Sequence, residues 1–131
     1  MWYRVSPRFG PLVTIKDPSL ATEYLEQSVL KYVMVTTWSN HWDKVGNTTS
    51  FSYSMLKGTI MNPERLVDHT PAIFIRIDRT TKLPKKCWEG EVYKITRRTE
   101  KVWFEFSLNR EIPCPQKYVG YPEGWYADQT A

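Results

Sequence analysis

Cysteine and histidine are scarce in this sequence, and long apolar runs are missing altogether. Cys87 and Cys114 stand apart without a CxxC spacing, and only two histidines accompany them, so we expect neither a disulfide framework nor a structural zinc site. No run approaches the roughly 18 apolar residues of a membrane span, and the N-terminus lacks the apolar core of a signal peptide. We therefore expect a cytoplasmic protein without a membrane partner.

Aromatic residues, by contrast, are abundant. The chain of 131 residues is 41% apolar and 15% aromatic, which is typical of a folded protein because disordered chains lack such apolar surface. This length supports one domain with one sizeable core. Without a repeat or a linker, residues 1–131 are interpreted as a single domain. It has an N-terminal arm and helix over residues 1–30, then strands and a C-terminal aromatic loop over residues 31–131.

One segment, "KDPSLATEYLEQSVL", predicts a helix near the N-terminus. Asp17 can cap the free backbone amides, and Pro18 suits the first helical position. The apolar residues of the segment fall on one helical face, so the helix should bury that face; they are Leu20, Tyr24, Leu25 and Val29.

The rest of the chain predicts mainly strands. The apolar run over residues 30–37 suggests a central strand buried on both faces, and residues 70–79 alternate between two faces. Residues 87–98 and 101–108 predict two adjacent strands with a short polar turn. One helix with five or six strands indicates an α+β fold, either a curled sheet or a small open β-barrel.

The order of these parts resembles the PUA-like superfamily, in particular its EVE-like and YTH-like branch. The segments that carry the resemblance are "YVMVTTWSNHW", "RLVDHTPAIFIRIDR" and "KLPKKCWEGEVYKI", within residues 31–112. The sequence departs from the pattern at Val67-Asp68-His69, where no glycine precedes the aspartate, and it lacks the closing C-terminal helix. The resemblance implies a small curled barrel that binds RNA or modified DNA.

That resemblance gives the stretch "TTWSNHWDK" a function. Modified-base readers hold the base between aromatic faces and read its edge with short polar groups. Trp38 and Trp42 would then be cage walls, Ser39 and Asn40 edge readers, and Trp125 a third wall. The alternative is that the tryptophans pack into the core.

Positive charge is concentrated in about one fifth of the chain. The formal net charge is +4, and the whole of the excess lies between Arg76 and Lys101. Such a stretch favours a polyanionic partner, although a solvated surface is the simpler alternative. The residues expected to contact phosphates are Lys85, Lys86, Arg97, Arg98 and Lys101.

The sequence thus predicts a non-catalytic nucleic-acid-binding module that needs no cofactor or metal. One alternative is a small protein that binds another protein or sequesters a small nucleotide, with aromatic loops as anchors. A second is a metal-independent nuclease or nucleotide-processing enzyme that uses His41, Asp43, Asp68 and His69, but P-loop, GxSxG and HExxH motifs are absent.

Overall fold

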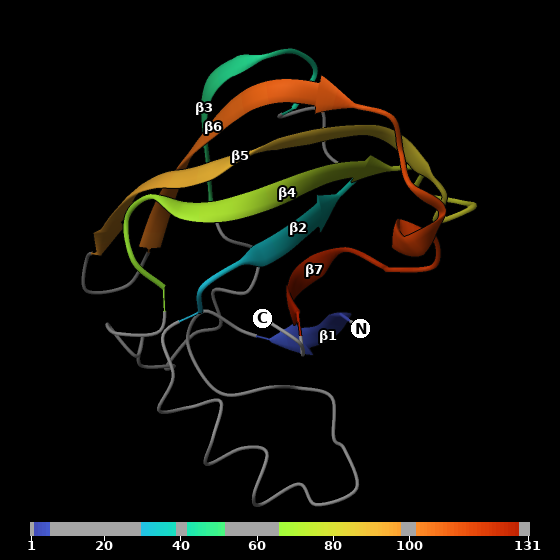
Figure 1. Ribbon diagram of the computed structural model, residues 1–131, viewed down its shortest axis with the longest axis horizontal. Helices are drawn as coiled ribbons and strands as arrows, with labels where there is room; N and C mark the ends of the chain where they lie inside the picture. Colours follow the sequence, from blue (N-terminus) through green and yellow to red (C-terminus); the bar gives the residue numbers. More distant parts are fainter. Residues whose placement is uncertain (1, 6–29, 39–41, 52–65, 98–101, 129–131) are drawn as a thin grey trace, which may run out of the picture.

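A computed structural model describes residues 2–5, 30–38, 42–51, 66–97 and 102–128 (Figure 1). Within these residues the regular secondary structure is almost entirely β. The elements are β1 (Trp2–Val5), β2 (Val33–Thr37), β3 (Gly46–Phe51), β4 (Thr70–Ile77), β5 (Pro84–Arg97), β6 (Val102–Ile112), the 3-10 helix η1 (Gln116–Tyr118) and β7 (Gly124–Asp128).

The seven strands form one mixed sheet in the order β1-β7-β2-β4-β5-β6-β3. β2 and β4 pair in parallel, and the other ladders are antiparallel. β4, β5 and β6 follow one another in space as in sequence, whereas β3 lies at the far edge beside β6. Figure 1 shows these long strands curving across the molecule, with β1 and β7 below them.

Alternation along the strands produces two cores, one on each face of the sheet. In β4 the side chains of Ile73, Ile75 and Ile77 pack on one face, and Phe74 packs on the other. All five residues of β2 are buried, which confirms the prediction of a central strand. The first core is aromatic and includes Trp42, Phe74, Trp88, Phe104, Phe106 and Trp125.

The predicted barrel is wrong for the described residues, because no ladder joins the edge strands β1 and β3 and the sheet stays open. The expected C-terminal aromatic loop is also corrected. Residues 124–128 form β7, which lies between β1 and β2 inside the sheet. The predicted helix over residues 16–30 lies almost wholly outside the described residues. No helix in the described part of the chain is long and apolar enough to cross a membrane.

Candidate nucleic-acid interface

The loop between β4 and β5 is held in one conformation by its first residue. Asp78 Oδ1 accepts hydrogen bonds from the backbone amides of Thr80 and Thr81 at 2.8 and 2.9 Å. The Asp78 backbone closes the turn, since its amide donates to the Leu83 carbonyl and its carbonyl accepts from the Lys82 amide, both at 2.9 Å. The Thr81 and Thr80 amides lower the pKa of Asp78, so the carboxylate is ionised at neutral pH.

Lys82 closes this loop in a left-handed conformation, with a φ of 63°. A residue with a Cβ atom adopts this conformation at a cost of about 1–2 kcal/mol, which is why glycine or asparagine is usual there. The Lys82 ammonium also donates a hydrogen bond to the Arg79 carbonyl at 3.1 Å. The loop therefore fixes where the lysine side chain leaves the backbone.

Trp38, directly after β2, lies beneath these cations. Its side chain is exposed (37%), the Lys82 Nζ atom lies 4.8 Å from the ring centroid, and the Arg79 Cζ atom lies 5.5 Å from it. Both distances are within the range of cation–π attraction. The backbone is anchored separately, because Glu123 accepts hydrogen bonds from the Thr37 hydroxyl at 3.0 Å and from the Trp38 amide at 3.3 Å. An indole is thus presented on a fixed backbone.

Two more lysines lie at the start of β5, at the same end of the sheet. Lys85 makes an ion pair with Asp78 at 3.5 Å, with both side chains partly exposed. The Lys86 ammonium donates to the Asp43 carbonyl at 3.3 Å. We call Trp38, Arg79, Lys82, Lys85 and Lys86 the basic end of the sheet. Figure 1 shows the β4–β5 loop protruding beyond the end of β2, at the right of the view.

The other predicted cage walls lie elsewhere. Trp42 and Trp125 are each 1% exposed and belong to the aromatic core. The Trp42 ring lies 5.1 Å from Phe74 and 5.4 Å from Phe106, and the Trp125 ring lies 4.8 Å from Phe104, measured between centroids. The structure therefore does not bring three tryptophans together around an open cage. The predicted edge readers, Ser39 and Asn40, lie outside the described residues.

The predicted phosphate contacts are also separated. Lys85 and Lys86 stand at the beginning of β5 and Arg97 at its end. β5 is 14 residues long, and at about 3.3 Å per residue its ends lie about 40 Å apart along the strand. Arg98 and Lys101 lie outside the described residues. Among the described residues of this set, Lys85 and Lys86 belong to the basic end and Arg97 lies far from them along β5.

Arg79 and Lys82 were missed as site residues, although the sequence carries a signal for them. The segment "DRTTKLP" begins with aspartate, which favours a tight turn, and lies between two predicted strands. A hairpin at this point brings its loop cations to the end of the sheet. Trp38 lies at this end of the sheet because β2 pairs in parallel with β4, and the sequence does not specify that pairing.

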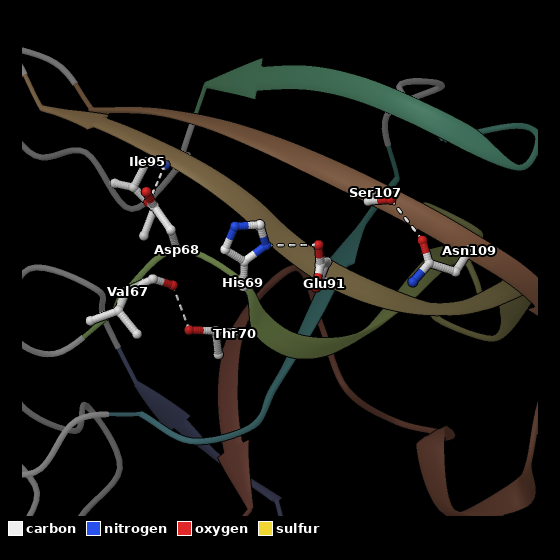
Figure 2. A network of polar contacts seen from close by, with 8 residues as sticks. All are labelled: Val67, Asp68, His69, Thr70, Glu91, Ile95, Ser107 and Asn109. Carbon is white, nitrogen blue, oxygen red and sulfur yellow. Dashed lines mark hydrogen bonds and ion pairs between the residues drawn. The ribbon is translucent and has the colours of Figure 1, made fainter.

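Two of the candidate acid–base residues, Asp68 and His69, belong to a polar network at the other end of the sheet (Figure 2). His69, with a φ of 67°, places its Nδ1 atom 3.0 Å from a Glu91 carboxylate oxygen. Asp68 accepts a hydrogen bond from the Ile95 amide at 2.8 Å. His69 itself takes the left-handed position of this turn, directly after Asp68.

These residues do not form one catalytic pocket with Asp43. Asp43 lies beside Lys86 near the start of β5, whereas Asp68 is bonded to Ile95 near its end, about 30 Å further along the strand. His41 lies outside the described residues. No group of three or more histidine, cysteine or acidic side chains in the described ranges is arranged to hold a metal ion.

Comparisons with protein-family models, with curated proteins and with solved structures find no match for this chain. The PUA-like resemblance therefore stays a prediction from the sequence pattern. Function has to be inferred from the geometry of the chain itself, and the basic end is the place where exposed aromatic surface and positive charge meet.

Proposed function

We propose that this chain is a non-catalytic nucleic-acid-binding module that holds unpaired nucleotides at the basic end of the sheet. A base stacks on the Trp38 indole, and neighbouring cations contact the phosphates. The observation that carries the proposal is the exposed Trp38 ring, with Lys82 and Arg79 at 4.8 and 5.5 Å from its centroid on an ordered loop.

An aromatic platform flanked by cations suits single-stranded nucleic acid. Base–aromatic stacking contributes about 1–3 kcal/mol per base and tolerates any sequence, because every base has a π-face. Bases inside a duplex already stack on one another, so an unpaired base is the better ligand for an exposed indole. A base that covers the ring displaces one of the cations, which is then free to contact the phosphate of the same nucleotide.

The charge at the basic end is modest. Four cationic side chains lie at the basic end, and two of them, Arg79 and Lys82, lie over the Trp38 ring. Two carboxylates nearby are already engaged, Asp78 by backbone amides and Lys85, and Glu123 by Thr37 and Trp38. If all four cations contact phosphates, the slope of log K against log salt for a single strand is about −3. This charge supports weak, salt-sensitive binding that requires stacking as well.

The experiment is a fluorescence-anisotropy titration of labelled single-stranded RNA, single-stranded DNA and duplex DNA, each with and without base methylation, at several salt concentrations. We expect both single strands to bind more tightly than the duplex, with a slope near −3. Tighter binding of a methylated strand would support the modified-base reading that the PUA-like resemblance implies. The titrations with unmethylated strands test the stacking site independently of modified-base reading.

Matched variants locate the interface. Arg79→Ala combined with Lys82→Ala should flatten the salt slope by about 1.4. Lys94→Ala is the control, because this exposed lysine lies toward the other end of β5. An unchanged slope in the double variant, or binding that does not respond to salt, would contradict the proposal. Salt-insensitive binding would favour the protein-binding alternative.

A further inference from the structure

The two cysteines, far apart in sequence, meet in the structure. The Sγ atoms of Cys87 and Cys114 lie 2.8 Å apart, although 27 positions separate them. The Cys87 thiol donates to Cys114 Sγ, and the contact is shorter than the roughly 3.5–4.0 Å at which nonbonded carbon atoms pack. The expectation that the thiols stand alone is therefore wrong, and the pair lies at the distance where a covalent bond requires only a small movement.

The β5–β6 ladder explains this meeting. Cys87 in β5 is paired with Ile112, the last residue of β6, so Cys114 comes two positions after the paired residue. Pro113 and Pro115 flank Cys114, and a proline cannot continue a ladder because it has no amide hydrogen. The chain therefore leaves the sheet at this point, and Cys114 lies beside the strand it has just left.

The two thiols differ in their surroundings. Cys87 is buried in the second core, and Cys114 is exposed. Burial raises the pKa of Cys87, and the contact with Cys114 adds to the shift, so its thiol stays protonated at neutral pH. An incoming oxidant therefore meets Cys114 first, and Cys87 is placed to react second.

We propose that Cys87 and Cys114 are a thiol-oxidation site that forms an intramolecular disulfide with a low-molecular-weight disulfide such as oxidised glutathione. The Cys114 thiolate attacks one glutathione sulfur, which breaks the glutathione S–S bond and releases one glutathione thiolate. Cys87 then passes its proton to that thiolate and attacks the Cys114 sulfur, which releases the second glutathione. Two protein thiols are oxidised, and one glutathione disulfide is reduced to two glutathione molecules.

The bond would tie the start of β5 to the segment that runs through η1 toward Glu123. It closes a loop across the 27 positions between the cysteines, and a loop of this length restricts the unfolded chain enough to raise the melting temperature by about 10–15 °C. This inference is independent of the proposed function. It concerns a site that titration with nucleic acid does not probe.

The test uses the full chain, incubated with oxidised glutathione or with dithiothreitol, then unfolded in denaturant in the presence of maleimide, so that the buried thiol can also react, and weighed intact. We expect the oxidised sample to lose two hydrogens, about 2 Da, to take up no maleimide, and to melt about 10–15 °C higher. A persistent glutathione adduct on the unsubstituted chain, a disulfide-linked dimer, or two maleimide-reactive thiols after oxidation would each overturn the inference.

Single serine variants assign the order of the steps. Cys87→Ser should stop at a glutathione adduct on Cys114, and Cys114→Ser should form no adduct, because the remaining thiol is buried. The opposite pattern would overturn the assigned order. Since the main measurement uses the unsubstituted protein, a variant that fails to fold does not remove the test.

Discussion

Replacing Trp42 by alanine should destabilise the fold severely without acting through a binding site. The ring is 1% exposed and makes edge-to-face contacts with Phe74 and Phe106. Truncation of a buried tryptophan removes this apolar surface and leaves a cavity, at a cost of about 3–5 kcal/mol. For a domain of this size the melting temperature should fall by about 12–20 °C.

A second variant separates packing from hydrogen bonding at the same position. The Trp42 Nε1–H is buried and has no hydrogen-bond partner within the described part of the chain, as is also true of Trp88 and Trp125. A buried donor without a partner costs about 1–3 kcal/mol. Trp42→Phe keeps the aromatic contacts and removes that donor, so we expect it to cost less than about 2 kcal/mol.

Urea unfolding of both variants measures these free energies directly, provided that the slope with denaturant is unchanged. A loss below about 1 kcal/mol for Trp42→Ala would refute the core assignment. If that small loss came with weaker nucleic-acid binding, Trp42 would instead be a wall of the site, as the resemblance implies.

Three further predictions concern two backbone positions and the pH dependence of stability. The free energy of unfolding of Lys82→Gly should be about 0.5–1 kcal/mol higher than that of Lys82→Ala, because glycine adopts the left-handed conformation without steric strain. Equal stability of the two variants in urea would contradict the φ of 63°. Gly90→Ala should lower the free energy of unfolding by about 2–3 kcal/mol, because a methyl group there would collide with the Ser107 carbonyl. Unchanged stability in the same urea assay would mean that the pairing of β5 with β6 is wrong. Burial raises the pKa of Tyr32 from 10.0 to about 12, so its contribution to stability is present below pH 10.0 and is lost as the pH rises through about 12. In Tyr32→Phe the melting temperature should therefore fall less steeply at alkaline pH than in the unsubstituted chain. Identical profiles of melting temperature against pH for the two proteins would exclude Tyr32 as the source of the fall.

The sequence predicts the long strands well because their signal is local. Side chains alternate between faces with a period of two, and the isoleucines of β4 and the phenylalanines of β6 follow it. β7 was missed because it has five residues, lies close behind Pro122, and is apolar on both faces, so nothing local distinguishes it from an aromatic loop. Its place is fixed by pairing with β1 and β2, which are far away in sequence.

The candidate site was only half predictable for the same reason. Trp38 and Trp42 are four positions apart, yet Trp38 is exposed and Trp42 lies in the core, a difference that their spacing in the sequence does not reveal. Lys86 and Arg97 belong to one basic stretch, but an extended strand carries them to opposite ends of the sheet. The cysteine contact depends on the register of the β5–β6 ladder, which spacing alone does not reveal.

The most direct test of the proposed site compares two exposed aromatic residues. Trp38 and Tyr93 are 37% and 41% exposed, but only Trp38 lies at the basic end. Trp38→Ala should weaken binding of a single strand by about 5–150-fold, the equivalent of one lost stacking contact of about 1–3 kcal/mol. It should change the free energy of unfolding by less than about 1 kcal/mol.

The measurement is an anisotropy titration of one labelled single strand against the unsubstituted chain, Trp38→Ala and Tyr93→Ala under the same low-salt conditions. The account predicts a large loss of affinity for the Trp38 variant and an unchanged affinity for the Tyr93 variant. Equal affinities for all three proteins, or equal losses in both variants, would contradict the claim that Trp38 is the stacking platform.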